Sequence, residues 1–505
     1  MKIEDWKKLQ NGSDIRGIAL AGVVGEQVNL TIEHSAILGK SFAVWLKKNG
    51  VNRGTVAIGA DSRISGMGLK QAFIRGLAES GFNVLDCGLA STPAMFMTTI
   101  DDRLGVDGAV MLTASHLPFN RNGMKFFTPK GGFDKRDVSD LLAIAGMGTF
   151  DLTEKIGTVS EIDFISDYAS SLVKFVRKGV NCKDQFDHPL AGLKIIVDAG
   201  NGSGGFFADK VLAPLGADIR GSQFLEPDGH FPNHVPNPED PHAMSSICDA
   251  VIREKADLGI IFDTDVDRAA IVDELGRPIN RNELIALISA VILEEHPQSV
   301  IVTDSITSAG LKWFIEEELG GIHHRFKRGY KNVINESIRL NVSGKESWLA
   351  IETSGHAALK ENHFLDDGAF LVAKLLVKMG LLKKENKNLS SLIEKMPVTL
   401  ENDEYRFAIK HTDFVNYGNM VILKLAELVE SIPGWSIEQP NFEGIRINCE
   451  NEKGWLLLRM SLHDPVMALN IESDVKGGGL KIAQKLSVLL SKYSDLDTSS
   501  LNLTP

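Results

Sequence analysis

The sequence predicts an α/β protein of four domains: three related α/β domains with mixed, mostly parallel sheets, and a C-terminal α+β domain. Length is the first observation, because 505 residues are too many for one core at roughly 150 residues per domain. The second is a pattern that occurs three times, in which an apolar run leads to an aspartate and a loop and helix follow. The aspartates are Asp61, Asp198 and Asp304. Such alternation of strand and helix favours a mostly parallel sheet.

The first region shows this alternation most clearly. Residues 36–48 have the apolar spacing of a helix, residues 55–59 are predicted to form a strand, and a second helix ends at Gly81. Residues 108–112 form a short apolar run typical of a buried strand. We expect the loop after that strand to collect reacting groups, as such loops do in open α/β sheets.

The pattern changes near residue 400. One helix then precedes two or three strands of antiparallel character and a final helix, which is typical of an α+β unit. The tail is predicted to be disordered. The expected ranges are strands at 194–198, 300–304 and 347–351, a helix at 413–431, strands at 444–448, 455–460 and 468–472, a helix at 480–491 and the tail at 495–505.

Polar stretches mark the expected domain boundaries. They lie at residues 178–189, at residues 294–299 and shortly before residue 400. We therefore divide the chain into domains over residues 1–185, 186–297, 298–398 and 399–505.

Composition excludes several classes of protein. The formal net charge of −12 argues against a nucleic-acid binder, which needs a basic face, but not against an anionic small molecule in a locally positive cleft. No run approaches the ~20 apolar residues of a membrane helix, and the N-terminus has no signal-peptide pattern. We therefore expect a cytoplasmic protein with no membrane partner. The four cysteines are scattered and form no zinc or disulfide pattern.

Residues 113–127 hold the first group of reactive side chains. They read T-A-S-H-L-P-F-N-R-N-G-M-K-F-F and place Ser115, His116 and Lys125 after a buried strand. Proline, asparagine and glycine disfavour regular structure, which indicates a shaped loop. A Ser-His pair alone is more often an ordinary polar turn. This stretch, however, resembles the T-A-S-H-N-P…N-G-x-K signature of the α-D-phosphohexomutase superfamily, with Leu117 where asparagine is usual.

The resemblance implies catalytic roles for these residues. In the superfamily the serine carries a phosphoryl group, and Ser115 matches it. An early segment, N-G-S-D-I-R-G, is similar to the family's G-T-D-G-I-R-G, whose arginine reaches the phosphoserine and corresponds to Arg16. Lys125 is implied as a candidate for proton transfer, and His116 as a residue that steadies the phosphate.

Three carboxylates stand at alternate positions after the next apolar strand. They are Asp263, Asp265 and Asp267. On one side of a loop they would repel one another strongly, and a hard divalent cation such as Mg²⁺ is the natural counter-charge. A solvated acidic loop is the alternative.

The same segment is similar to the family's D-G-D-x-D-R metal loop. Thr264 replaces the glycine, and Arg268 closes the motif. The resemblance implies one Mg²⁺ per chain, held by the three aspartates and by a phosphate oxygen on Ser115.

A third loop carries Glu352, Ser354 and His356. A carboxylate and a hydroxyl two residues apart suit contact with vicinal hydroxyls, and the histidine can act as a general acid or base near neutral pH. The segment is similar to the family's G-E-x-S-G-H sugar loop, which implies that Glu352 and Ser354 bind the sugar.

Two further loops contain positively charged side chains. The K-R-G-Y segment resembles a K-x-G-[HFY] loop of the family that recognises the sugar and its phosphate; its residues are Lys327, Arg328, Gly329 and Tyr330. The second resembles the family's phosphate clamp, R-x-S-x-T-E-P, at Arg459 and Ser461, with His463 where threonine is usual and Asp464 where glutamate is usual. A guanidinium and a hydroxyl two residues apart suit a phosphate dianion.

Residues 227–239 resemble another family segment, P-D-G-x-F-P-N-H…P-N-P-E. Their proline density predicts a rigid loop, and we assign them no chemistry. With this segment the resemblance extends over all four domains in the family's order.

These matches together imply a phosphohexomutase whose four domains surround a central cleft. It would interconvert hexose 1-phosphate and hexose 6-phosphate, of glucose and/or mannose, through a phosphoserine and a hexose 1,6-bisphosphate. The implied cofactors are Mg²⁺ and glucose 1,6-bisphosphate as activator, the partner is a small phosphosugar, and we expect a monomer or homodimer. The alternatives are an amino-sugar phosphate mutase or bisphosphate-forming enzyme, and a non-catalytic sugar-phosphate-binding homologue.

Overall fold

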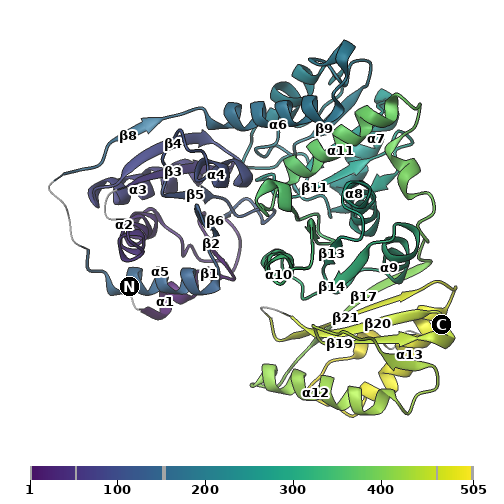
Figure 1. Ribbon diagram of the computed structural model, residues 1–505. Coiled ribbons are helices and arrows are strands. Elements are labelled where there is room, and N and C mark those ends of the chain that lie inside the picture. Colours follow the sequence, from purple (N-terminus) through teal and green to yellow (C-terminus); the bar gives the residue numbers. More distant parts are fainter. Residues whose placement is uncertain (1–2, 52–53, 151–154, 462–463, 502–505) are drawn as a thin grey trace. The chain divides into compact units, whose positions relative to one another are not determined.

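The computed structural model describes residues 3–51, 54–150, 155–461 and 464–501. The chain forms two compact units. Figure 1 shows the helices and strands along the chain. Unit 1 contains residues up to 280 together with 354–390, and unit 2 contains residues 281–353 together with those from 391 onward. No helix of the described residues is both long enough and apolar enough to cross a membrane.

Unit 1 begins with a mixed sheet in the order β1-β2-β6-β5-β3-β4-β8, with β7 paired to β6. The neighbours β5, β3, β4 and β8 run parallel, and β6 is antiparallel to both β5 and β2. The strands are β1 (Gln10–Asn11), β2 (Asp14–Ile18), β3 (Thr55–Ala60), β4 (Asn83–Leu89), β5 (Gly108–Leu112), β6 (Arg121–Thr128), β7 (Gly131–Gly132) and β8 (Val159–Glu161).

Apolar helix faces cover this sheet. Phe42 and Phe73, from two adjacent helices, pack with Phe126 of β6, with centroids of the Phe42 and Phe126 rings 5.1 Å apart. Burial of such aromatic side chains is a main source of stability in a core. The helices are α1 (Ile3–Lys7), α2 (Ile32–Lys48), α3 (Gly66–Glu79), α4 (Thr92–Thr98), α5 (Lys135–Met147) and α6 (Phe164–Val180).

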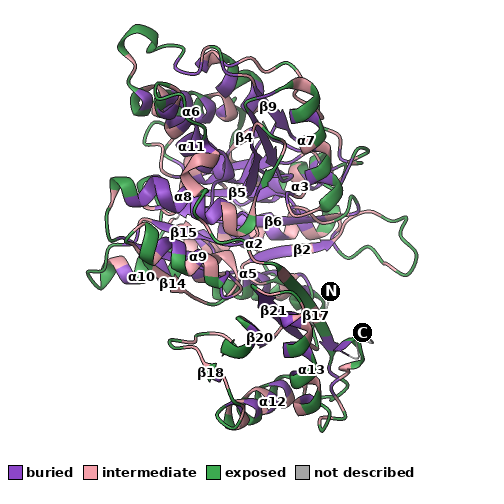
Figure 2. Cartoon of the chain, turned by 90° about the vertical axis from the view of Figure 1, so that its right-hand side faces the viewer, coloured by how far each residue is buried: buried purple, intermediate pink, exposed green. Residues whose placement is uncertain are grey.

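The second sheet of unit 1 has the order β12-β11-β10-β9, in which β9 and β10 are parallel and the other pairs antiparallel. Every residue of β9 and of β10 is buried, and β9 is accordingly purple in Figure 2. α11 packs against α6 (Figure 1). The elements are β9 (Ile195–Asp198), α7 (Pro241–Glu254), β10 (Leu258–Phe262), β11 (Ala269–Val272), β12 (Pro278–Ile279), β16 (Ala357–Leu359) and α11 (Gly368–Lys383), with short helical turns at Lys183–Gln185, Phe207–Leu212, Ala213–Leu215 and Lys360–Asn362.

Unit 2 contains a parallel arrangement in which β13 pairs with β14 and with β15, and a separate antiparallel sheet in the order β17-β21-β20-β19-β18. The first group comprises α8 (Arg281–Glu295), β13 (Val300–Thr303), α9 (Ala309–Trp313), β14 (Ile322–Arg325), α10 (Tyr330–Val342) and β15 (Leu349–Ile351). The second comprises β17 (Glu401–Ala408), α12 (Phe414–Val429), β18 (Trp435–Ile437), β19 (Ile445–Cys449), β20 (Gly454–Met460), β21 (Val466–Ser473) and α13 (Gly478–Leu490). Short helical turns lie at Phe314–Glu318, Glu450–Glu452 and Ser499–Leu501, and another at Leu389–Ile393, where the chain passes from unit 1 to unit 2.

The predicted fold class is confirmed: α/β domains with mixed sheets precede a domain with an antiparallel sheet. The sequence did not reveal β17 and β18. β17 has mostly exposed or half-buried residues and therefore lacks the apolar alternation that indicates a strand.

The prediction of a disordered tail is wrong for the described part of that segment. Leu496 and Leu501 are 4% and 2% exposed, and they pack into the core of the C-terminal domain. The backbone N–H of Asp497 donates to the Ala408 carbonyl at 2.9 Å. Two isolated leucines thus anchor a tail whose overall composition is polar.

A buried histidine gives unit 1 a pH-dependent contribution to stability. His234 Nε2 lies 3.0 Å from Asp198 Oδ1. Burial lowers the pKa of His234, but the hydrogen bond and charge of Asp198 outweigh burial and raise it above the usual value. Because the folded state favours the charged ring, this stability is fully present below about pH 6.5 and is lost as pH rises through the higher folded-state pKa.

We therefore expect His234→Gln to lower the free energy of unfolding more at pH 6 than at pH 9. Urea denaturation of both chains across that range measures the difference, and an equal loss at all pH values would contradict the assignment. His242→Gln is a suitable control, because His242 lies near the start of α7 and is exposed.

Candidate active site

Ser115 lies in the loop between β5 and β6, in an unusual backbone conformation. Its φ of +51° falls in the left-handed region, which costs a non-glycine residue roughly 1–3 kcal/mol. The hydroxyl donates to Asp263 Oδ2 at 3.1 Å and lies 3.2 Å from His116 Nδ1. The backbone N–H donates to the Thr113 hydroxyl at 2.8 Å. Strain of this kind at a reactive group is typical of a functional site.

The serine loop is held by Arg63, which follows β3 and is 2% exposed. Asp61 lies beside it, with Oδ2 3.2 Å from Arg63 Nε. Burial raises the pKa of Asp61 to about 6, against the opposing charge of Arg63. The guanidinium donates to four backbone carbonyls of the loop: those of Ser115, Leu117 (2.6 Å), Pro118 (2.7 Å) and Arg121 (3.0 Å). Because Leu117 takes part through its carbonyl, this contact does not depend on its side chain.

Replacing Arg63 by lysine is expected to lower kcat by about 100-fold, because an ammonium cannot reach four carbonyls and the serine shifts from its position. A coupled mutase assay on the folded variant measures this. Arg103→Lys is the control, since Arg103 is an exposed arginine with the same kind of aspartate partner. Full activity of a folded Arg63→Lys chain would show that the serine loop keeps its shape without the guanidinium.

The predicted metal ligands lie in the loop between β10 and β11. Asp263, Asp265 and Asp267 are all 0% exposed, and one oxygen from each lies within 4.8 Å of the others. Asp265 Oδ1 and Asp267 Oδ1 are buried without a hydrogen-bond partner. Unpartnered carboxylate oxygens at this density need a counter-charge, and hard oxygen ligands suit Mg²⁺. The residues therefore fit a divalent cation.

The backbone of Thr264 is unstrained in this loop. Its backbone is not among the residues with positive φ; Val266 is, at +67°. The Thr264 carbonyl accepts from Ser203 N at 2.8 Å. A glycine at position 264 is therefore not required by the backbone conformation.

Lys125, on β6, neutralises part of the acidic charge. Its ammonium contacts Asp267 Oδ2 closely and lies 3.2 Å from Asp265 Oδ2. Burial raises the pKa of Asp267, but the charges of Lys125 and of nearby His356 and Arg268 outweigh it and hold that pKa below its usual value. Burial and repulsion from the other two aspartates raise the pKa of Asp263. The three carboxyl groups are thus electrostatically unequal.

Arg268 connects the serine loop with the acidic loop. It is 2% exposed, and its Nε donates to Asp263 Oδ2 at 3.2 Å. Nη2 donates to the Ser115 hydroxyl at 3.3 Å and to His116 Nδ1 at 2.6 Å. Nη1 donates to Asn237 Oδ1 at 3.2 Å. One guanidinium therefore holds the reactive hydroxyl, the neighbouring imidazole and one metal-loop carboxylate.

His116 is a neutral ring at physiological pH. Burial, followed by the positive charges of Arg268, His356 and Arg16, lowers its pKa to about 3. Its Nδ1 accepts a hydrogen bond from Arg268, which fixes the tautomer with the proton on Nε2.

Arg16 lies on β2 beside the serine loop. It donates to the Thr113 carbonyl and, at 2.8 Å, to Asp14 Oδ2. Gly123 is its partner in the strand register, and a Cβ there would lie 2.1 Å from the Ile15 carbonyl and 2.9 Å from Arg16 Cδ. Glycine at position 123 therefore permits the close approach of β6 to β2 beside Arg16.

His356 completes the group in unit 1. Its Nδ1 lies 2.6 Å from Asp366 Oδ2 and 3.8 Å from Asp267 Oδ1. Burial lowers the pKa of His356, but these two carboxylates outweigh burial and raise it to about 9. The two carboxylates therefore favour the protonated form of the imidazole.

Most of the predicted sugar and phosphate ligands lie in unit 2; Ser354 belongs to unit 1. Glu352 Oε1 accepts from Gly329 N at 2.6 Å, so the two predicted sugar loops meet. Gly329, with φ +108°, precedes α10, which begins at Tyr330. Arg328 Nε lies 3.6 Å from Asp304 Oδ2, whereas Lys327 is exposed.

The predicted phosphate clamp begins on β20. Arg459 is 5% exposed, and its Nε is buried without a hydrogen-bond partner. Burial and the charge of Arg328 lower the pKa of Arg459. A buried donor without a partner next to a second arginine suits an oxyanion. Ser461 follows β20 and its hydroxyl accepts from Asp464 N at 3.3 Å, and His463 lies outside the described residues.

For three residues of the site in unit 1, the sequence predicted no role. Arg63 stands in the D-S-R segment directly after β3, Asn237 in the proline-rich loop to which we assigned no chemistry, and Asp366 in the segment before α11. The position of Arg63 after a predicted strand was a usable signal. Asn237 and Asp366 become recognisable only through their contacts.

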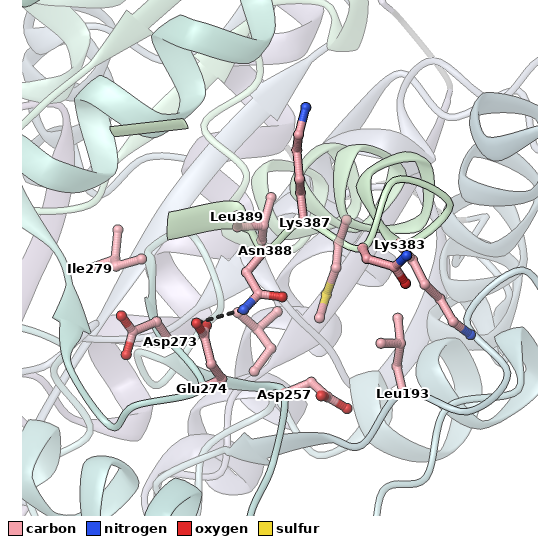
Figure 3. A pocket seen from close by; sticks show the side chains of 12 residues that line it. Leu193, Asp257, Asp273, Glu274, Ile279, Lys383, Lys387, Asn388 and Leu389 are labelled. Carbon is pink, nitrogen blue, oxygen red and sulfur yellow. Dashed lines mark hydrogen bonds between the residues drawn. The ribbon is translucent and has the colours of Figure 1, made fainter. Parts of the chain in front are cut away.

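A separate cavity of about 280 Å³ lies elsewhere in unit 1 (Figure 3). Leu258, at the start of β10, lines it, whereas the metal loop follows the end of that strand. Asn388 and Glu274, which both line it, are hydrogen-bonded at 2.7 Å. It shares no residue with the site described above.

Three family models match the chain in succession. They are described as phosphoglucomutase/phosphomannomutase, alpha/beta/alpha domain I, over residues 7–144, domain II over residues 168–276 and domain III over residues 280–399.

Relatives match over nearly the whole length. A phosphomannomutase/phosphoglucomutase of Pseudomonas syringae pv. tomato is 30% identical over 95% of this chain and 96% of its own length. A phosphoglucomutase of Neisseria gonorrhoeae is 29% identical over 94% of this chain and 96% of its own. The crystal structure of a phosphoglucomutase/phosphomannomutase family protein of Burkholderia thailandensis has the same fold, with a TM-score of 0.78, 24% identity, and coverage of 97% of this chain and 98% of that one.

The chain therefore belongs to the phosphoglucomutase/phosphomannomutase family of the α-D-phosphohexomutase superfamily. It is a hexose phosphate mutase, an isomerase of the phosphotransferase type.

Proposed function

We propose that this enzyme interconverts hexose 1-phosphate and hexose 6-phosphate, of glucose, mannose or both, through a phosphoryl group carried by Ser115. The observation that carries the proposal is the Ser115 hydroxyl, 3.1 Å from Asp263 of the buried acidic loop and within reach of Arg268. The relatives named phosphoglucomutase and phosphomannomutase support glucose and mannose phosphates as substrates.

In the first half-reaction the bond between phosphorus and Ser115 Oγ breaks as a new one forms to the free hydroxyl of the sugar monophosphate. The hydroxyl proton passes to Lys125 or to His356. The accepting group must be in its neutral form, which a cation held by the neighbouring Asp267 would favour. The hexose 1,6-bisphosphate reorients and returns its other phosphoryl group to Ser115, and the proton returns to the newly freed hydroxyl. The chain mainly positions groups and neutralises charge, as phosphoryl transfer requires.

Asp263, Asp265 and Asp267 would hold one Mg²⁺ per chain, with an oxygen of the phosphate on Ser115. Bound there, the ion supplies positive charge that stabilises the transferring phosphoryl group. Arg16 and Arg268 flank the serine and hold its phosphate. The neutral His116 steadies the phosphate through its Nε2 proton.

In unit 2, Arg459 and Ser461 bind the phosphate that does not react, together with His463, while Lys327, Arg328 and Tyr330 contact the sugar phosphate. Glu352 and Ser354 bind the sugar hydroxyls. Glucose 1,6-bisphosphate acts as activator because it phosphorylates Ser115. We further propose a cytoplasmic monomer or homodimer with domains over residues 1–185, 186–297, 298–398 and 399–505.

A coupled assay with Mg²⁺ and a trace of glucose 1,6-bisphosphate tests the substrate assignment. Glucose 1-phosphate and mannose 1-phosphate are expected to turn over faster than glucosamine 1-phosphate. Preference for glucosamine 1-phosphate would favour an amino-sugar mutase, and no turnover of any sugar would favour a non-catalytic binding protein.

Arg459→Lys is expected to raise KM for glucose 1-phosphate by about 10- to 100-fold, because lysine keeps the charge but loses the planar fork that binds a phosphate through two hydrogen bonds. Initial rates over a range of substrate concentrations measure KM and kcat. Arg406→Lys is the control, as Arg406 is exposed on β17 in the same unit. An unchanged KM would remove Arg459 from the binding site.

A further inference from the structure

A second carboxylate lies directly behind His356. Asp366 Oδ2 is 2.6 Å from His356 Nδ1, and Asp366 Oδ1 accepts a hydrogen bond from Ala357 N at 3.1 Å. Asp366 is 7% exposed. Both oxygens are thus directed to His356 and to the residue that follows it, with little competition from water.

The backbone on either side of this pair is fixed to the metal loop. His356 and Arg268 form an isolated antiparallel bridge. Gly355, with φ +93°, brings its Cα so close that a Cβ would lie 2.9 Å from the Ala269 carbonyl. Gly368 N donates to the Val266 carbonyl at 3.2 Å. The imidazole and the carboxylate therefore have little freedom to move apart.

The adjacent Asp367 holds this segment to the neighbouring helices. Its side chain caps α11 by accepting from Phe370 N at 2.8 Å, and it accepts from the Tyr168 hydroxyl of α6 at 2.6 Å and from Asn362 Nδ2 at 2.9 Å. Asp366 makes none of these contacts. Two neighbouring buried aspartates thus have separate partners, one on the helix scaffold and one on the candidate proton carrier.

We propose that Asp366 is a positioning residue that holds the His356 imidazole in the orientation required for proton transfer. A carboxylate bound to one ring nitrogen fixes the rotation of the ring and the place of its proton. The inference rests on the proposed function, since it requires that His356 take part in moving the proton.

The test combines four chains: wild type, Asp366→Asn, His356→Gln and the double variant. We expect Asp366→Asn to lower kcat by about 10- to 100-fold and to change KM less than threefold. In the double variant, the same change is expected to add less than about twofold to the loss of kcat in His356→Gln, because the effects of residues that act through one another are not additive. Asp366→Glu, which restores the carboxylate, is expected to recover part of kcat. The short hydrogen bond between His356 and Asp366 is expected to give a proton NMR signal far downfield in wild type. This signal should disappear in His356→Gln, which tests the hydrogen bond without any change to Asp366.

Tyr168→Phe is the matched control, because it removes a buried hydrogen bond from Asp367 and leaves His356 untouched. It is expected to lower the melting temperature but not kcat. Normal kcat in Asp366→Asn, an undiminished effect of that change in the His356→Gln background, or absence of the downfield proton would overturn the inference. Normal kcat in His356→Gln would instead remove His356 from the mechanism, and a chain that acquires no phosphoserine from glucose 1,6-bisphosphate would overturn the proposed function itself.

Discussion

Replacing Ser115 by alanine is expected to abolish mutase turnover, with a loss of kcat of at least ~1,000-fold. Alanine has no oxygen to carry the phosphoryl group, and removal of a covalent nucleophile is among the most damaging changes in an enzyme. A coupled assay with glucose 1-phosphate measures the loss. The change is small in volume, and it removes one donor to Asp263, so the chain should fold.

Ser289→Ala provides the matched control. Ser289 is fully buried on α8, and its hydroxyl has no hydrogen-bond partner. Loss of that hydroxyl is therefore expected to leave kcat near normal. Turnover by Ser115→Ala within tenfold of wild type would mean that another group carries the phosphoryl or that none does.

Changing Asp265 to asparagine is expected to remove Mg²⁺-dependent turnover and to weaken Mg²⁺ binding by more than ~100-fold, because the ion loses a charged oxygen ligand. Calorimetric titration with Mg²⁺ and thermal unfolding measure binding without reference to activity. Mg²⁺ should raise the melting temperature of wild type by mass action but not that of the variant. Melting without Mg²⁺ serves as the baseline for each chain, because the change reduces repulsion among the three carboxylates and also weakens the attraction to Lys125.

Asp273→Asn is the control for loss of a buried carboxylate from the same sheet. Asp273 follows β11, is 3% exposed and pairs with Arg277. It is expected to lose stability yet keep the full response to Mg²⁺. A normal Mg²⁺ response in Asp265→Asn would show that the ligands are wrongly assigned.

The main parts of the candidate site were predictable because they stand where apolar strands end. Ser115 follows β5 and Asp263 follows β10, and both strands are short apolar runs with clear ends. The motif spacing around them predicted side chains that the structure brings together. The family identification from these motifs is confirmed by the family models and the relatives.

The residues that hold those groups were not predictable in the same way. Arg63 donates to backbone carbonyls. Because every residue has a backbone carbonyl, the sequence of the loop does not indicate this contact. Asp366 contacts His356 across a separation of 10 residues, and Asn237 contacts Arg268 across a separation of 31 residues. The prediction of the tail failed for a related reason: Leu496 and Leu501 are buried by tertiary contacts that local composition does not reveal.

Intact-mass measurement of the phosphoryl group on Ser115 tests the central claim most directly. Wild type and Ser115→Ala would each be incubated with glucose 1,6-bisphosphate and Mg²⁺. Mass spectrometry of the intact chain measures the added mass, and mass spectrometry after peptide digestion locates the phosphoryl group. We predict one phosphoryl group per wild-type chain, located on Ser115 and lost when excess glucose 1-phosphate is added without the bisphosphate, and none on the variant. An unmodified wild-type chain that nevertheless turns over glucose 1-phosphate, or a phosphoryl group on Ser115→Ala at the same level, would contradict the account.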